Sequence, residues 1–263
     1  MAGVKKSVRS RFSLSRLTFR EVEKELSRFP ALILPLGGCE PYGECGCLGM
    51  ASACVEALAT ALSEKLHLLL APVQMYGCST AYGAFGGTAG VKPRTLTNIL
   101  CETVRRWYQQ GFRTIIIVDA LFDNGGAVDP ALRRLKNTNP DMRIIPFSLQ
   151  RDERIRAFIG RHVRTKEPGR TEYGILSLAA FIDPDLVRAT NKNHAAAAEV
   201  DAERYWTWRK RGADPEQYRK LFPDCSSSGT VCRFDPDFGR ELFGFIFQLL
   251  VDTVAPFIKS NQK

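Results

Sequence analysis

The sequence predicts an α/β fold, a three-layer α/β/α sandwich built around a mostly parallel sheet. Two observations carry this prediction. Short apolar segments of strand length alternate with longer segments that have helical spacing. The short segments are apolar on both faces, as strands are when helices cover a parallel sheet from both sides. A chain of 263 residues, 44% of them hydrophobic, is large enough to bury the core of such a domain.

Four predicted strands and three predicted helices account for most of this pattern. The strands are residues 31–36 (ALILPL), 68–73 (LLLAPV), 114–120 (TIIIVDA) and 143–147 (RIIPF). Helical spacing covers residues 51–66 and 94–111, and Gly111 is a suitable C-terminal stop. Residues 236–258 are predicted to form a closing helix that directs five apolar side chains inward: Leu242, Phe245, Ile246, Leu249 and Leu250.

Two segments do not fit this alternation. Residues 1–15 are basic and precede the first acid, Glu21, so we expect a flexible arm followed by a single domain at residues 16–263. A basic, serine-containing start is also typical of an organelle transit peptide. Residues 186–223 mix charged residues with aromatic ones, and we expect an excursion over the sheet edge that serves as a lid or a subunit contact. The aromatic residues are Tyr205, Trp206, Trp208 and Tyr218.

Composition limits the partners and the cellular setting. The net charge is +9, but no nucleic-acid-binding module is recognisable, so nucleic acid is not an expected partner. The longest apolar run, residues 242–251, is interrupted by Gln248 and is shorter than the roughly 18–20 residues of a membrane span, so no membrane is expected. Eight cysteines without a signal peptide predict reduced thiols in the cytoplasm. Cys225 and Cys232 could pair only if oxidised.

The predicted topology places the functional site in three loops. Sites of doubly wound sheets form where the strands reach their carboxyl ends. That rule selects residues 37–49, 74–90 and 121–127, which are rich in glycine and polar residues. Neither a P-loop nor a dinucleotide fingerprint is present in them, so the glycines are expected to shape the loops rather than to bind phosphate.

These loops resemble those of the creatininase family. The family's first loop reads approximately P-x-G-S-x-E-Q-H-G-P-H-L-P-L-G-T-D. The chain keeps six of these positions in register: Pro35, Gly37, Glu40, Gly43, Leu48 and Gly49. The second loop resembles the family's F-P-G-T at residues 85–88, and the third its GF-[KR]-x-[IV]-[IV]-[IV]-x-N-G-H-x-x-N at residues 111–124. Residues 16–26 and 234–243 resemble the opening and the closing helix of the family.

This resemblance implies a homo-oligomer, often a hexamer, and a two-metal centre that hydrolyses a C–N bond in a small cyclic amide or formamide. The chain keeps the glutamate ligand as Glu40 and a shorter carboxylate as Asp123. Other ligand positions are altered: Tyr42 and Leu121 replace histidines, and Ala51 replaces the bridging aspartate. In the segment that aligns with H-A-G-x-x-E-T-S, Arg170 and Ile175 replace the catalytic histidine and the glutamate. The usual metal pair is therefore not expected, because methyl, isobutyl and phenol groups do not replace carboxylate and imidazole ligands.

The residues that remain allow several chemistries. Glu40, Asp123 and Arg170 are the candidate catalytic residues. A small polar ligand could be bound by five further residues: Tyr42, Tyr82, Asn124, Cys39 and Cys45. If a divalent ion (Zn, Mn or Fe) is bound, Glu40, Asp123 and Cys45 are its expected ligands. Alternatively, the cysteines only fill space beside the glycines.

Three hypotheses about function remain open, and the sequence leaves undecided whether the protein is an enzyme. The first is a divergent creatininase-like protein that has lost its metals and binds a small polar ligand or a protein partner, inactive or with altered chemistry. The second is a working amidohydrolase with a non-standard metal or cysteine-containing site. The third is a binder of nucleic acid or an anionic surface that acts through the basic arm at residues 1–15.

Overall fold

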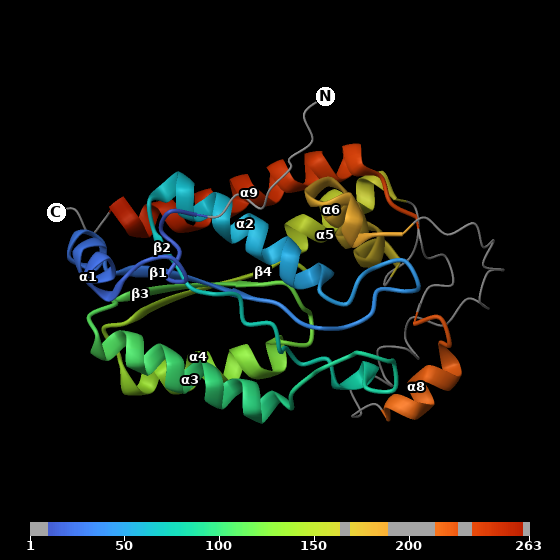
Figure 1. Ribbon diagram of the computed structural model, residues 1–263, viewed down its shortest axis with the longest axis horizontal. Helices are drawn as coiled ribbons and strands as arrows, with labels where there is room; N and C mark the ends of the chain where they lie inside the picture. Colours follow the sequence, from blue (N-terminus) through green and yellow to red (C-terminus); the bar gives the residue numbers. More distant parts are fainter. Residues whose placement is uncertain (1–9, 164–168, 189–213, 226–232, 260–263) are drawn as a thin grey trace.

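A computed structural model of the chain describes residues 10–163, 169–188, 214–225 and 233–259 (Figure 1). Four parallel strands form one sheet in the order β2-β1-β3-β4. They are β1 (Ala31–Leu36), β2 (Leu69–Leu70), β3 (Thr114–Asp119) and β4 (Arg143–Ser148). The prediction of a mostly parallel sheet is confirmed, although the predicted strand 68–73 is reduced to two residues.

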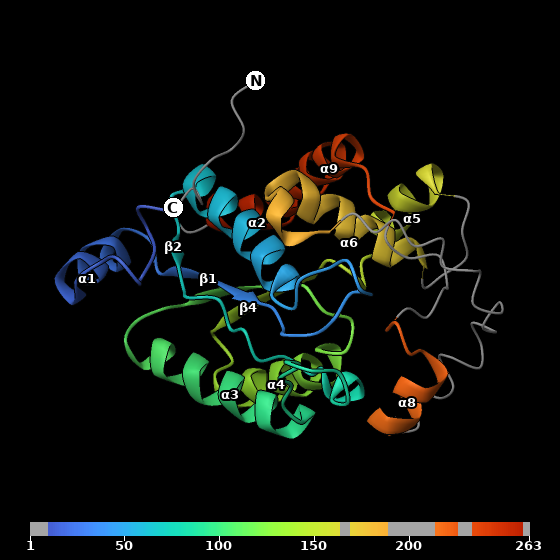
Figure 2. The same cartoon turned by 45° about the vertical axis from the view of Figure 1, so that its right-hand side comes forward.

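Helices cover both faces of the sheet, which confirms the predicted three layers (Figures 1 and 2). One layer contains α2 (Met50–Leu66), α5 (Glu153–His162), α6 (Gly169–Ile182) and α9 (Pro236–Lys259). The other contains α3 (Pro93–Gln109) and α4 (Gly125–Thr138). The predicted helices at 51–66, 94–111 and 236–258 correspond to α2, α3 and α9. Gly111 follows α3 with φ +109°, a conformation that glycine adopts readily.

The alternation of side chains along the strands explains why two cores form. Ala31 and Ile33 on β1 point into the core beneath α2, α6 and α9. Leu32, Leu34 and Leu36 point the other way, into the core beneath α3 and α4. Because successive side chains of a strand alternate between faces, a strand that is buried on both faces must be apolar throughout, as β1 is.

The closing helix α9 packs along its whole length through one row of side chains. Every fourth residue is buried: Phe238, Leu242, Ile246, Leu250, Val254 and Ile258. The prediction was right for Leu242, Ile246 and Leu250, whereas Phe245 and Leu249 lie at the edge of this row and are half-buried. By length and composition alone α9 could also cross a membrane. Its buried row packs against α2 and α6.

The N-terminal segment begins with contacts to the domain. Residues 10–15 belong to the predicted arm, yet Ser10 and Phe12 are buried and the Phe12 ring stacks on His67. The predicted arm stays a prediction for residues 1–9, which lie outside the described residues. Helix α1 (Phe19–Arg28) then begins at a capping box, in which Thr18 and Glu21 each accept a hydrogen bond from the other's backbone N–H.

Three short helices complete the described structure: η1 (Thr80–Tyr82), η2 (Pro184–Leu186) and α8 (Pro215–Leu221). Helix α8 belongs to the predicted excursion and packs beside η1 at one end of the sheet (Figure 2). Of the aromatic residues named for that excursion, Tyr218 is buried in α8. Tyr205, Trp206 and Trp208 lie outside the described residues.

Candidate functional site

The strand register aligns the loops that carry the candidate residues. Leu36, Asp119 and Ser148 are level with one another at the carboxyl ends of β1, β3 and β4. The chain leaves β1 toward β2 on one side and β3 toward β4 on the other, so the topological switch point lies between β1 and β3. Ligand sites of open α/β sheets form at such a point.

Glu40 lies on the loop after β1 and is buried, with 5% of its surface exposed. Ser79, on the loop after β2, donates a hydrogen bond of 2.7 Å from Oγ to Glu40 Oε2. Burial and the neighbouring Glu40 carboxylate, to which it is hydrogen-bonded, together raise the pKa of Tyr42 well above its ordinary value. The Tyr42 phenol therefore stays protonated and acts as a hydrogen-bond donor toward Glu40.

Asp119, the last residue of β3, is a second buried acid of the site. Its Oδ1 accepts hydrogen bonds from Asn124 Nδ2 (2.8 Å) and from the Leu121 backbone N–H (3.2 Å). Burial raises the pKa of Asp119 to about 7, although these hydrogen bonds and the positive charge of Arg151 oppose the shift. The sequence prediction did not include Asp119. A carboxylate that ends an otherwise apolar strand was the available signal.

Asn124 holds the three predicted loops together. It is fully buried, donates from Nδ2 to the Gly37 carbonyl (3.2 Å) and accepts at Oδ1 from the Cys78 backbone N–H (2.8 Å). Loops 37–49, 74–90 and 121–127, which the topology selects as the site, thus meet at this one side chain. Because its amide is used by the protein itself, Asn124 positions the loops.

Two residues that the sequence resemblance sets at metal-ligand positions are apolar and buried. Leu121 is buried and packs against Gly38 and Gly77: a Cβ at these glycines would lie 2.3 Å and 3.0 Å from Leu121 Cδ1. Ala51 is fully buried in the first turn of α2. Both side chains are part of the packed interior of the site.

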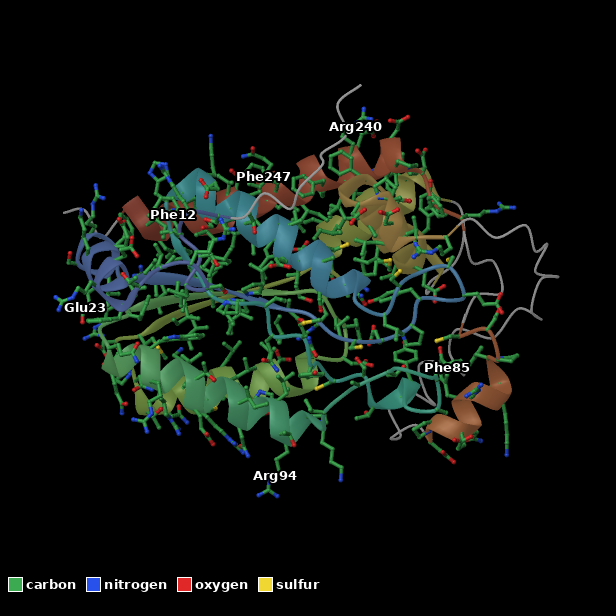
Figure 3. All side chains as sticks on the ribbon, in the orientation of Figure 1. Phe12, Glu23, Phe85, Arg94, Arg240 and Phe247 are labelled. Carbon is green, nitrogen blue, oxygen red and sulfur yellow. The ribbon has the colours of Figure 1, made fainter. Side chains whose placement is uncertain are left out.

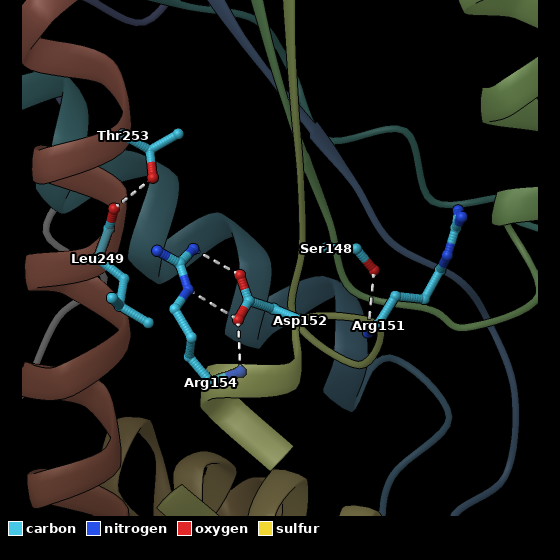
Figure 4. A network of polar contacts seen from close by, with 6 residues as sticks. All are labelled: Ser148, Arg151, Asp152, Arg154, Leu249 and Thr253. Atoms are coloured by element: carbon cyan, nitrogen blue, oxygen red, sulfur yellow. Dashed lines mark hydrogen bonds and ion pairs between the residues drawn. The ribbon is translucent and has the colours of Figure 1, made fainter. Parts of the chain in front are cut away.

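The loop after β4 is a fourth component that the sequence prediction did not include. Gln150 Nε2 donates to the Tyr42 hydroxyl (3.3 Å), and Gln150 Oε1 accepts from the Phe122 backbone N–H (3.3 Å). The next residue, Arg151, donates its backbone N–H to Ser148 Oγ (Figure 4). The Arg151 guanidinium forms a bidentate pair with Asp129 at 3.1 and 2.8 Å. The rule of strand carboxyl ends would have selected this loop as well.

The predicted thiols lie around the first loop but make separate contacts. Cys39 Sγ donates to the Gly87 carbonyl (3.4 Å) and Cys45 Sγ to the Tyr42 carbonyl (3.6 Å). Burial raises the pKa of Cys78 to about 12, with further contributions from Asp123, Asp119 and Glu40. A buried thiol among acids stays protonated and is a poor nucleophile or metal ligand at neutral pH.

The remaining predicted residues lie in different surroundings. Asp123 is half-buried in the loop after β3, close enough to Cys78 to raise the pKa of that thiol. Tyr82 packs edge-on against Tyr218 of α8, with the ring centroids 5.2 Å apart, in an aromatic cluster outside the two main cores. Arg170 lies in the first turn of α6, and its side chain is outside the described residues.

The ligand groups of the described residues do not fit a two-metal centre. Within the described residues, no group of three or more histidine, cysteine, aspartate and glutamate side chains is arranged to hold a metal ion. His67 at the end of α2 stacks on Phe12, and His162 at the end of α5 lies against Phe158 and Phe238. Glu40 already accepts a hydrogen bond from Ser79, and Leu121 offers no donor atom. The site is thus a buried hydrogen-bonded network of carboxyl, hydroxyl and amide groups.

Comparison with known proteins gives a consistent result. The family described as creatinine amidohydrolase matches residues 15–254. Creatinine amidohydrolase of Pseudomonas putida is 23% identical over 146 residues, which is 51% of this chain and 56% of that protein. A tryptophan-to-phenylalanine mutant of creatininase superposes with a TM-score of 0.70 at 19% identity, covering 94% of this chain and 99% of that one. A glutamate-to-glutamine mutant of creatininase, of Zn-Zn type, superposes with a TM-score of 0.67 at 20% identity, covering 97% of this chain and 99% of that one.

Proposed function

Because the chain belongs to the creatininase family, we propose that it is a creatininase-like protein that binds a small polar ligand without the family's metal pair. The ligand would bind at the carboxyl ends of β1, β3 and β4. The proposal includes the loss of metal-dependent hydrolysis of C–N bonds. It also includes self-association in the cytoplasm, as the family resemblance and the composition suggest.

The contact that carries this proposal is the hydrogen bond from Ser79 Oγ to Glu40 Oε2. A carboxylate that accepts several hydrogen bonds has fewer lone pairs left for a cation and less charge to be neutralised. Here hydroxyl groups of Ser79 and Tyr42 donate to Glu40. Leu121 packs against the glycines of two neighbouring loops, at a position where the family has a histidine. In this proposal, hydrogen-bond donors of the protein stabilise the Glu40 carboxylate in place of metal ions.

The groups at the edge of this network suit a small molecule with both donors and acceptors. Asp123 offers a half-buried carboxylate, and Gln150 an amide that links the first and third loops. Carboxylates accept hydrogen bonds and amides do both, so a compact amide, urea or guanidine would match them. No cysteine-based hydrolase is favoured, because Cys45 is buried and donates to the Tyr42 carbonyl.

The metal content of freshly purified protein tests the first part of the proposal. We expect less than about 0.2 equivalents of zinc, manganese or iron per chain, and no hydrolysis of creatinine after addition of Zn²⁺ or Mn²⁺. Two equivalents of tightly bound metal that are lost in Glu40→Gln and in Asp123→Asn would contradict it. That result would favour the amidohydrolase hypothesis, with Glu40, Asp123 and Cys45 as candidate ligands.

Calorimetric titration tests the second part, with creatinine, creatine and formamide as probes. We expect at least one probe to bind to the wild type and to bind at least tenfold more weakly to Asp123→Asn and to Gln150→Ala. Gln109→Ala, an exposed glutamine on α3, serves as the matched control and should bind as the wild type does. Equal affinity in all variants would place the binding elsewhere on the protein.

A further inference from the structure

The two helical layers differ in charge. Helices α3 and α4 together carry six bases and two acids, and Lys92 immediately precedes α3. The opposite layer, formed by α2, α5, α6 and α9, carries seven bases and seven acids. A substantial part of the positive charge of the folded chain is therefore concentrated on the outer face of α3 and α4.

These basic side chains lie on two helices that pack against each other, and we call this surface the α3/α4 basic face. Arg134 Nη1 on α4 donates to Asn98 Oδ1 on α3 (3.2 Å), so the exposed rows of the two helices are in contact. Arg94 extends away from the body at the start of α3 (Figure 3). The seven bases are Lys92, Arg94, Arg105, Arg106, Arg133, Arg134 and Lys136.

The face has little negative charge to balance these bases. Asp129, one of the two acids, is held in a bidentate pair by Arg151, which leaves Glu102 as the other. None of the seven bases forms an ion pair with another residue in the described ranges. Six of them are exposed and Arg105 is half-buried. An uncompensated basic face on a folded surface attracts polyanions.

The kind of polyanion follows from the side chains on this face. Five of the seven bases are arginines, whose guanidinium groups can bind phosphate oxygens in a bidentate manner. The exposed large hydrophobic residues in the described ranges all lie on other elements: Phe19, Met75, Tyr76, Phe122, Leu221 and Phe257. A membrane surface would therefore find no apolar side chain to insert, and unstacked bases no exposed aromatic ring.

We infer that the α3/α4 basic face binds the phosphate backbone of double-stranded nucleic acid without reading its sequence. Helix α3 is about 25 Å long, enough to extend over several phosphates of a duplex. This activity is separate from the ligand site at the carboxyl ends of the strands. It also differs from binding through residues 1–15, because it uses side chains fixed on two packed helices.

The test uses a fluorescent 20-base-pair duplex and the full-length protein, titrated at several salt concentrations. We expect the logarithm of the association constant to fall linearly with the logarithm of the salt concentration. The slope should be no steeper than about −6 if seven bases take part. The variant Arg133→Glu/Arg134→Glu should bind at least tenfold more weakly. Its salt dependence should be shallower, with a slope smaller in magnitude by about 2, one for each lost phosphate contact.

The matched control is Lys65→Glu/Arg240→Glu, on exposed positions of α2 and α9, which lowers the net charge of the protein by the same amount. It should bind within about threefold of the wild type, and thermal melting should confirm that both variants are folded. An equal loss in both variants would show that net charge alone drives binding and would overturn the inference. So would a loss caused only by deletion of residues 1–15, binding to vesicles rich in phosphatidylserine but not to the duplex, or no binding at all.

Discussion

Ser79 and Glu40 are 39 residues apart in the sequence and share a hydrogen bond of 2.7 Å between two buried side chains. A buried carboxylate that loses its donor bears the cost of desolvation without compensation. The Ser79 hydroxyl therefore stabilises the Glu40 loop, in addition to any part it has in ligand binding.

Removal of that hydroxyl tests its contribution to stability. We expect Ser79→Ala to lower the free energy of unfolding by about 1–3 kcal/mol, measured by urea denaturation. Thr80→Ala changes the neighbouring residue, which is exposed, and should have an effect of less than about 0.5 kcal/mol. Equal effects of the two substitutions would show that the Ser79–Glu40 hydrogen bond contributes nothing specific.

The buried acid Asp119 should make stability depend on pH in a defined direction. Its pKa is raised to about 7 in the folded protein, from 3.8 in an unfolded chain. Between about pH 4 and pH 7 the folded state therefore holds a proton that the unfolded state has released. Stability contributed by this residue is complete below pH 4, falls as the pH rises to 7 and is constant above that.

Asp119→Asn should remove this dependence, because the amide oxygen can still accept from Asn124 Nδ2 and from the Leu121 N–H. At pH 8 the variant should be more stable than the wild type by about 2 kcal/mol or more, and at pH 4 the two should differ little. Denaturation curves across this range measure the difference. The control Asp252→Asn, at an exposed position of α9, should leave the shape of the profile unchanged.

How far the sequence could predict this structure depends on whether a signal is local. The strand 31–36 is apolar throughout and was predicted to the residue, because burial on both faces leaves no polar position. The segment 68–73 is likewise apolar throughout, yet only Leu69 and Leu70 pair with β1 as strand residues. Pairing is decided by the neighbouring strand, which a local pattern does not reveal.

The same distinction applies to the site. The meeting of three loops at Asn124 followed from topology, which fixes where strands end. The contributions of Ser79 and Gln150 depend on hydrogen bonds between different loops. Ser79 is 39 residues away from Glu40 in the sequence, and Gln150 is 108 residues away from Tyr42. Tyr82 is a candidate ligand-binding residue on the second loop, but its ring packs against Tyr218, which belongs to the predicted excursion at residues 186–223.

Two glycines in α9 should respond in opposite directions to the same substitution. A Cβ at Gly239 would lie 1.9 Å from the Ser177 carbonyl oxygen of α6, so the helices can approach this closely only at a glycine. A Cβ at Gly244 would meet no atom within 4 Å. Gly239→Ala should therefore destabilise the protein by about 2 kcal/mol or more, since backbone must move. Gly244→Ala should stabilise it by about 0.5–1 kcal/mol, because alanine favours the helix.

Thermal and urea denaturation of the two alanine variants measure both effects in one helix. Gly244→Ala is the control for Gly239→Ala, because the substitution and the helix are the same and only the surroundings differ. Two changes of the same sign would show that α6 and α9 are not in the close contact described for Gly239 and Ser177.

The aromatic cluster around α8 should unfold independently of the two main cores. Tyr218 has 1% of its surface exposed and contacts the rings of Tyr82, Phe85 and Phe222. The guanidinium of Arg219 adds a contact to the Phe85 ring, at 5.5 Å. Because this cluster is separate from the cores that cover the sheet, its loss should be local.

Tyr218→Ala is expected to increase amide hydrogen exchange in residues 80–85 and 214–225 by at least tenfold, as seen by mass spectrometry. Exchange in β1 and β3 should stay the same, since no side chain of those strands belongs to the cluster. Leu221→Ala, at an exposed position of the same helix, should leave exchange in both regions unchanged. Faster exchange throughout β1 and β3 in Tyr218→Ala would show that α8 is part of one cooperative core with the sheet, and that the cluster does not open on its own.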